Sequence, residues 1–280
     1  MSPVPPHDIT LVLSGGGAKT AAHLGVVRAL TAAGLRPTRY VGTSMGAVIA
    51  TGLAAGLQPD VLAERLLAVR QQDAFAVDRT ALIKGLWARA LLKPDALRRT
   101  LERLLPVAAF AELEVPLTIT ATDVDSGAEL VFGAGGEEVG LLDALCASCA
   151  LPPFFPPFVL EGRRCADGGL REVVPLAIAA RFPADLVIAV DVGSGFDMES
   201  NLSRPRQPAL IELQSSAQWV LMASNTALTL ALWRATPGRP RLLWIRPRVR
   251  EAETFATDRL RWYLAEGERA ANAELATLRT

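Results

Sequence analysis

The sequence predicts an α/β fold in which helices cover both sides of a mostly parallel central sheet, giving three layers, α/β/α. Short β-prone runs alternate with longer helical segments along the chain, an order that is typical of parallel sheets. Half of the residues are hydrophobic but only 6% are aromatic, which fits a sheet covered by helices rich in Ala, Leu and Val. A length of 280 residues suits one domain, residues 1–280, and the sequence contains neither a linker nor an internal repeat.

The alternation predicts six strands and eight helices in chain order. The strands are expected at residues 10–13, 39–41, 117–121, 129–132, 186–190 and 242–245. The helices are expected at residues 18–33, 45–57, 59–69, 94–105, 141–150, 174–181, 209–232 and 257–278. Gly34 favours a left-handed C-cap, so the first helix should end just before it.

Three segments are expected to stand apart from this alternation. Residues 1–8 should form a loose N-terminal tail, and the polar residues 194–208 should form a surface loop. Residues 59–113 are helical and rich in charge, and they either cover the functional site as a lid or form a plain helical insertion. Four leucines of this segment share one helix face: Leu97, Leu101, Leu104 and Leu105.

Charge and cysteine content argue against a nucleic-acid-binding protein and against a disulfide-bonded secreted protein. Lys plus Arg and Asp plus Glu each number 29, so no general attraction to nucleic acid is expected. The N-terminus lacks the basic start and apolar core of a secretory signal. Cys146, Cys149 and Cys165 give no disulfide framework, and we interpret them as buried small side chains. These observations favour a cytoplasmic protein and indicate no particular oligomeric state.

The most informative motif is G-x-S-x-G, which spans Gly42-Thr43-Ser44-Met45-Gly46. A β-prone run precedes it and a small-residue helix follows it, which is the strand–turn–helix context of a nucleophile elbow. The turn is so sharp that a side chain at Gly42 or Gly46 would collide with the backbone. Ser44 is therefore predicted to be a nucleophile, exposed at a helix N-terminus.

A serine hydroxyl needs a base to take its proton. The two histidines, His7 and His23, both precede Ser44, whereas an ordinary α/β-hydrolase places its acid and then its histidine after the serine. His23 either packs in the core or lines the site, so a permuted Ser–His pair stays open. A carboxylate is the favoured base.

A glycine-rich turn at Gly15, Gly16 and Gly17 follows the first predicted strand and leads into a helix with Lys19. The spacing fits neither a P-loop nor a dinucleotide-binding motif. Backbone N–H groups that converge at a helix N-terminus favour an oxyanion hole. Lys19 either orients this loop and adds positive charge or is an ordinary solvated lysine.

A second glycine-rich turn contains Asp167, Gly168 and Gly169. The paired glycines allow a tight loop in which the carboxylate approaches another element closely. Taken alone, the motif also fits a simple Asp-Gly turn. Its position after the other two motifs makes Asp167 the candidate base.

These motifs, in this order, resemble the bacterial patatin-like phospholipases over most of residues 9–192. The resemblance implies a patatin-like α/β fold and a Ser44–Asp167 dyad that hydrolyses lipid acyl esters without a metal or other cofactor. It also implies that Gly15, Gly16 and Gly17, with Lys19, form the oxyanion loop, and that the partner is a lipid or acyl-ester substrate, with peripheral membrane contact. Family members usually carry Arg-Gly where this chain has Lys19-Thr20. They often carry Asn after the second turn, near Glu172 and Val173 here.

Two other functions stay open: a soluble carboxylesterase or thioesterase on small acyl substrates, and a non-catalytic lipid- or partner-binding member of the fold. Two apolar segments bear on the choice. Residues 151–158 either shape an acyl pocket or form a buried connection. Residues 213–233 lack charge and are expected to form a buried or interfacial helix, whose Trp219 and Met222 border an acyl groove or pack in the core.

Overall fold

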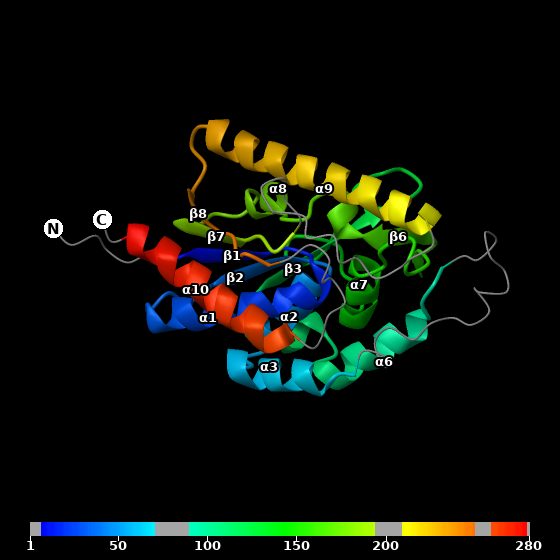
Figure 1. Cartoon of the computed structure of the whole chain (residues 1–280), viewed down its shortest axis with the longest axis horizontal. Helices are drawn as coiled ribbons and strands as arrows, with labels where there is room; N and C mark the ends of the chain where they lie inside the picture. Colours follow the sequence, from blue (N-terminus) through cyan, green and yellow to red (C-terminus); the bar gives the residue numbers. More distant parts are fainter. Residues whose placement is uncertain (1–6, 71–89, 194–208, 250–258, 279–280) are drawn as a thin grey trace.

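The computed structural model describes residues 7–70, 90–193, 209–249 and 259–278, and Figure 1 shows a central sheet between two layers of helices. The strands are β1 (Ile9–Leu13), β2 (Arg39–Thr43), β3 (Leu117–Asp123), β4 (Glu129–Gly133), β5 (Phe158–Leu160), β6 (Arg163–Asp167), β7 (Leu186–Val190) and β8 (Arg241–Ile245). The α-helices are α1 (Ala21–Ala32), α2 (Met45–Ala54), α3 (Pro59–Ala68), α6 (Pro94–Leu104), α7 (Leu141–Ser148), α8 (Leu176–Ala179), α9 (Ala209–Ala235) and α10 (Leu260–Leu278). Short 3₁₀ turns occur at Gly17–Thr20, Phe110–Glu112 and Gly168–Leu170.

The sheet has eight strands in the order β5-β6-β3-β2-β1-β7-β8, with β4 also paired to β3. Strands β3, β2, β1, β7 and β8 run parallel, whereas β4 and β6 run antiparallel to β3 and β5 runs antiparallel to β6. This arrangement confirms the predicted three-layer, mostly parallel fold. The ends of β1 and β2 lie side by side, because Leu13 pairs with Gly42. The loops after these two strands therefore meet at one edge of the sheet, where ligands bind in open α/β folds.

Most of the predicted elements occur, but some differ in extent and two strands were not predicted. The first helix begins as a 3₁₀ turn, because Gly17 has a φ of 60° and the chain is still turning sharply there. Helix α8 is shorter than predicted, and α9 continues to Ala235. Strands β5 and β6 were not predicted from the sequence. Gly34 has a φ of 77° just after α1, as predicted for a left-handed cap.

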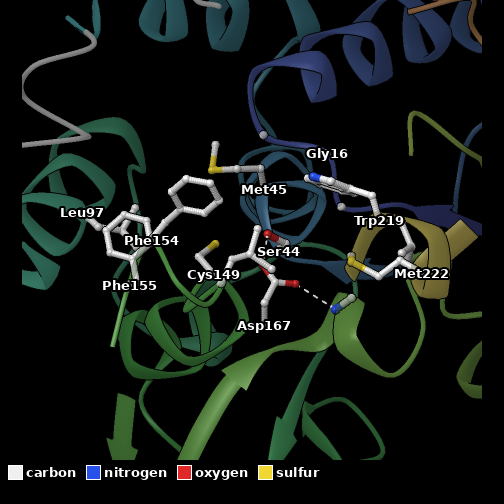
Figure 2. Close-up of a pocket in the computed structure, with 15 residues that line it drawn as sticks. Gly16, Ser44, Met45, Leu97, Cys149, Phe154, Phe155, Asp167, Trp219 and Met222 are labelled. Atoms are coloured by element: carbon white, nitrogen blue, oxygen red, sulfur yellow. Dashed lines mark hydrogen bonds between the residues drawn. The ribbon is translucent and has the colours of Figure 1, made fainter. Parts of the chain in front are cut away.

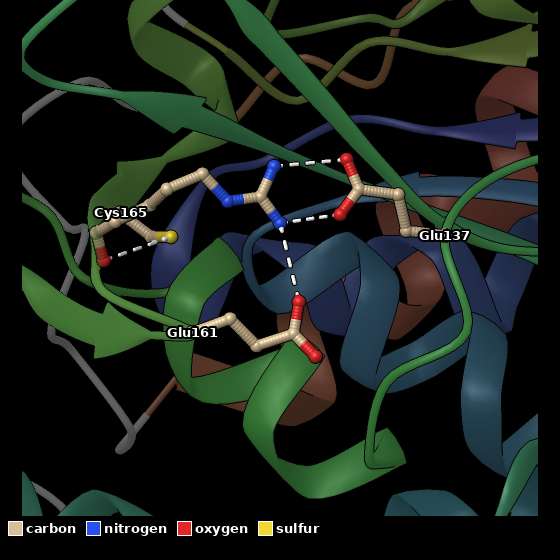
Figure 3. Close-up of polar contacts among 4 residues, drawn as sticks. Glu137, Glu161 and Cys165 are labelled. Atoms are coloured by element: carbon tan, nitrogen blue, oxygen red, sulfur yellow. Dashed lines mark hydrogen bonds and ion pairs between the residues drawn. The ribbon is translucent and has the colours of Figure 1, made fainter.

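Strands β5 and β6 form a hairpin that carries Asp167 at its far end. The turn consists of Glu161 and Gly162, whose φ values of 49° and 80° match the right-handed twist of a two-residue hairpin. The guanidinium of Arg163 donates to both carboxylate oxygens of Glu137 and lies 3.8 Å from Glu161 (Figure 3). This pairing lowers the pKa of Glu137 and ties the hairpin to the segment after β4.

The two faces of the sheet are covered by different helices. Helices α1, α2, α3 and α10 lie on one face, and α8 and α9 lie on the other (Figure 1). Side chains of β1 alternate accordingly, with Leu11 and Leu13 in the first core and Val12 in the second. Helices α1 and α10 touch through their backbones, since a Cβ on Gly25 would lie 1.9 Å from the carbonyl oxygen of Leu264.

The structure describes only parts of the three segments predicted to lie outside the alternation, residues 1–8, 59–113 and 194–208. His7 and Asp8 are held rather than loose, because both backbone N–H groups donate to Asp185, at 2.9 and 3.0 Å. Residues 1–6, 71–89 and 194–208 lie outside the described residues, so the rest of the tail, the lid and the surface loop stay predictions. The leucine face predicted in the insertion is buried. Among the described helices, none has both the length and the apolarity needed to cross a bilayer.

Candidate active site

The serine predicted to be a nucleophile occupies a strained turn between β2 and α2. Ser44 has φ 55° and ψ −134°, a conformation that non-glycine residues rarely adopt. A Cβ on Gly42 would lie 2.6 Å from Ala47 Cα, and one on Gly46 would lie 2.3 Å from the carbonyl oxygen of Ser14. A side chain at Gly42 would therefore collide within the elbow, and one at Gly46 would collide with the segment that follows β1.

Ser148 holds this elbow from a helix that is distant in sequence. The backbone N–H of Ser44 donates to the Oγ of Ser148 at 2.7 Å, and Ser148 is fully buried at the end of α7. Because 104 positions separate the two residues, no local pattern in the sequence indicated this contact. Ser148 was therefore missed as a residue of the site.

The sheet brings Asp167 to Ser44 because β2 and β6 pair with successive parts of one edge of β3, while β4 pairs with its other edge. Thr43 in β2 pairs with Thr120 in β3, and the next residue of β3, Ala121, pairs with Asp167 in β6. The Oγ of Ser44 donates to Oδ2 of Asp167 at 2.6 Å, and Oδ1 accepts the N–H of Gly169 at 2.8 Å (Figure 2). Asp167 ends a strand rather than lying in a loop, and Gly168 begins a 3₁₀ turn.

The surroundings of Asp167 make its carboxylate a stronger base than usual. Burial raises its pKa to about 6, although the hydrogen bonds from Ser44 and Gly169 act in the opposite direction. The side chain is only 2% exposed. Asp167 is thus ionised at neutral pH, and its pKa is close enough to neutrality for it to accept a proton in catalysis.

The first glycine-rich turn lies directly beside Ser44. A Cβ on Gly15 would lie 3.2 Å from the Cβ of Ser44. The N–H of Gly15 donates to the carbonyl oxygen of Val173 at 3.1 Å, so it is already used. Within the described residues, no acceptor takes the N–H of Gly16 or Gly17, and both glycines line the pocket that contains Ser44. These two donors, next to the N-terminus of α2, can receive negative charge.

Lys19 is buried behind this turn. Its side chain has no exposed surface, and its ammonium lies 5.9 Å from the centre of the Trp219 ring. The interpretation of Lys19 as a solvated lysine is therefore wrong. Its contact with α9 supports the alternative, that it orients the loop and adds positive charge.

His23 is not the partner of Ser44. It is completely buried on α1, and its Nε2 donates to the carbonyl oxygen of Ser14 at 2.9 Å. Burial lowers its pKa to about 4, so the ring is neutral at physiological pH. Because Ser44 donates to Asp167 instead, the geometry favours the carboxylate over a permuted Ser–His pair.

An apolar pocket opens over the Ser44–Asp167 pair. Leu97, Phe154 and Phe155 lie on one side of Ser44, and Trp219 and Met222 lie on the other (Figure 2). The lining also includes Met45, Cys149, Leu151, Gly169 and Val173. Residues 151–158 thus contribute to the pocket rather than serving only as a buried connection. Helix α9 contributes to it as well.

The cysteines are buried and unbridged, as predicted. Cys149 lines the pocket beside Ser44, and burial, followed by the charge of Asp167, raises the pKa of its thiol well above the usual value. The thiol is therefore a neutral, apolar wall of the pocket.

Glu172 follows the turn that carries Asp167, near the position where the resemblance leads one to expect asparagine. Its buried carboxylate accepts the N–H groups of Leu176 and Ala177, at 3.1 and 3.2 Å. Burial raises its pKa to about 7. Glu172 caps α8 and does not reach the pocket, whereas Val173 lines it.

Comparison with known proteins agrees with this geometry. Residues 11–180 match the family model described as patatin-like phospholipase. An uncharacterized NTE family protein of Mycobacterium tuberculosis is 30% identical over 222 residues, which cover 79% of this chain and 57% of that protein. Patatin-like phospholipase domain-containing protein 6 of Homo sapiens is 30% identical over 195 residues, 67% of this chain and 14% of that protein.

The fold also resembles a solved structure. The crystal structure of VipD from Legionella pneumophila matches with a TM-score of 0.52 at 14% identity, covering 98% of this chain and 67% of that chain. This likeness concerns the fold alone, whereas the family model and the relatives rest on sequence. The chain belongs to the patatin-like phospholipase family.

Proposed function

We propose that this protein is a serine acyl hydrolase that cleaves fatty-acyl esters of phospholipids, lysophospholipids or related lipids with a Ser44–Asp167 dyad. The observation that carries the proposal is the 2.6 Å hydrogen bond from Ser44 Oγ to Asp167 Oδ2 at the base of an apolar pocket. Relatives named patatin-like phospholipases support a lipid substrate. Because the chain covers only part of these relatives, the activity of the whole protein is part of the proposal.

In the first step, Asp167 accepts the proton of Ser44 as Oγ attacks the ester carbonyl. The carbonyl oxygen gains negative charge, which the N–H groups of Gly16 and Gly17 stabilise as an oxyanion hole. The tetrahedral intermediate then collapses and releases the alcohol, which takes the proton from Asp167. Ser44 is left carrying the fatty acyl group.

In the second step, water attacks this acyl-serine, and Asp167 serves as base again. The acid is released and Ser44 recovers its proton. The apolar pocket holds the acyl chain, because its walls are Leu, Met, Phe and Trp side chains. No residue in the scheme requires a metal or other cofactor.

The test is hydrolysis of a diacyl phospholipid, a lysophospholipid and a short-chain p-nitrophenyl ester by the purified protein and its variants. Ser44→Ala and Asp167→Asn should each lower the rate by about 10³-fold or more while the protein stays folded. Ser126→Ala and Asp125→Asn are matched controls, because both residues are exposed on the turn after β3. Unchanged hydrolysis in either dyad variant would refute the assignment. Activity on the short ester alone would favour the small-substrate esterase.

A further inference from the structure

Helix α9 differs from an ordinary surface helix, because it is apolar on its outer side as well as on the side where Met222 and Trp233 are buried. Its exposed side carries five large apolar side chains: Leu213, Val220, Leu221, Leu228 and Leu232. Leu221 and Leu228 are 70% and 69% exposed, values expected of charged residues rather than of leucine. The Ser, Thr, Asn and Gln side chains between Ser215 and Thr229 are instead half-buried against the protein. We call these five side chains the outer face of α9.

The outer face contains no charged side chain, although a charged residue lies at each end of it. Residues 213–233 include no charged side chain, whereas Glu212 and Arg234 at the two ends are exposed. Figure 1 shows α9 as the outermost element on its side of the sheet, so no other described helix lies over it. Contiguous apolar surface of this kind marks an interaction site rather than chance exposure.

The inner side of the same helix belongs to the pocket. Trp219 and Met222 line the pocket beside Ser44, and each is adjacent in sequence to an outer-face residue. The amide of Asn225 donates to the carbonyl oxygen of Arg171, and the hydroxyl of Thr229 bonds the Glu172 carboxylate. Both partners lie on the segment that follows Asp167. Whatever covers the outer face therefore lies against a helix that borders the pocket.

We propose that the outer face of α9 docks on the surface of a phospholipid bilayer, with the helix lying along the membrane. This inference rests on the proposed function, because a lipid acyl hydrolase must take its substrate from such a surface. A helix that lies on the protein surface with uncharged Leu and Val side chains facing outward can bury that side in the membrane interface. Docking by α9 places the lipid next to the helix that forms one wall of the acyl pocket.

The experiment is co-sedimentation with phosphatidylcholine vesicles at low and at high salt. Wild type and Ser44→Ala should bind equally, and binding should depend weakly on salt because the outer face is uncharged. The variant Leu221→Glu/Leu228→Glu should lose at least tenfold in vesicle affinity. Leu221→Ser/Leu228→Ser should lose less, and circular dichroism should show that both variants are folded.

The matched control is Val61→Glu/Leu67→Glu. Both residues are exposed on α3, across the sheet from α9, so this variant should bind vesicles like wild type. Docking is wrong if wild type does not bind vesicles or if the α9 variants bind as tightly. Docking on a bilayer is also wrong if wild type binds no vesicles and forms a dimer in sedimentation velocity that the α9 variants abolish. The outer face would then be a dimer interface. Vesicle binding by a protein that hydrolyses no ester would leave docking intact and reject the proposed function.

Discussion

The two faces of the sheet are built in opposite ways. On the α1/α10 face, Gly25 and Gly267 bring the two helix backbones into contact. Leu24 and Leu30 of α1 have no exposed surface. On the α8/α9 face, α9 buries Met222 and Trp233 among half-buried polar side chains and leaves leucines exposed on its outer side. The first face is a closed core, which fixes the elbow at Ser44 in a strained conformation. The second is open, and it forms one wall of the pocket that we assign to the acyl chain.

The largest effect is expected where the closed face is tightest. In Gly25→Ala, the new Cβ would lie 1.9 Å from the carbonyl oxygen of Leu264, so α1 and α10 must separate. We expect the free energy of unfolding to fall by about 3 kcal/mol or more in urea titrations. Gly34→Ala is the control, because it meets no atom within 4 Å and its only penalty is the positive φ, about 1 kcal/mol. Equal losses in the two variants would contradict close packing of these helices.

A smaller effect is expected where the closed face supports Ser44, the nucleophile that we propose. Ser148→Ala leaves the buried N–H of Ser44 without its acceptor, which should cost about 1–3 kcal/mol of stability. We also expect kcat for a soluble ester to fall by about tenfold or more, because Ser44 loses the group that positions it. Thr51→Val is the control, since its buried hydroxyl bonds only a carbonyl of its own helix. An unchanged kcat in Ser148→Ala would show that Ser148 does not position Ser44.

The pH dependence of the reaction rate tests whether burial raises the pKa of Asp167. With its pKa near 6, kcat/KM for a soluble ester should be level above that pH and fall about tenfold per unit below it. If the rate stayed level down to about pH 4.5, Asp167 would behave as an ordinary exposed carboxyl.

The same shift has a consequence for stability with a definite sign. Between the usual Asp value of 3.8 and about 6, the folded protein binds the Asp167 proton more tightly than the unfolded chain does. Its contribution to the unfolding free energy is therefore present at low pH and is lost as pH rises through about 6. Asn does not titrate, so Asp167→Asn should not lose stability as pH rises through about 6. Urea titrations at neutral pH should find the variant at least as stable as wild type.

The smallest effect is expected on the open face. Leu228→Ala should change the unfolding free energy by less than about 0.5 kcal/mol, because its side chain is already in water. Leu30→Ala, at a fully buried position of α1, should cost about 2–5 kcal/mol. A large loss in Leu228→Ala would mean that the outer face of α9 is covered within the protein itself.

The parts of the site that the sequence predicted are those with a local cause. Gly42 indicated the elbow because the collision that it avoids, with Ala47, arises within a few residues, whereas Gly46 avoids a collision with the distant Ser14. Gly34 indicated a helix end for a local reason as well. The alternation of strands and helices was sufficient to predict the parallel core of the sheet, since each of those strands is a short β-prone run.

The parts that were missed depend on contacts between distant segments. The β5–β6 hairpin was overlooked because the prolines of residues 151–158 suggested a connection, although Glu161-Gly162 between two short runs is a hairpin signal. The contact of Ser148 with Ser44 and the buried position of Lys19 follow from the packing of segments that are distant in sequence. The role of α9 in the pocket was left open because helix periodicity does not show which side faces the protein.

The most direct test of the account is labelling with a fluorophosphonate probe, followed by mass spectrometry of the modified peptide. A serine whose proton passes to Asp167 should be labelled rapidly and at Ser44, and Asp167→Asn should slow labelling by about 100-fold or more. Labelling at another serine, or equally fast labelling of the Asp167→Asn protein, would contradict the dyad.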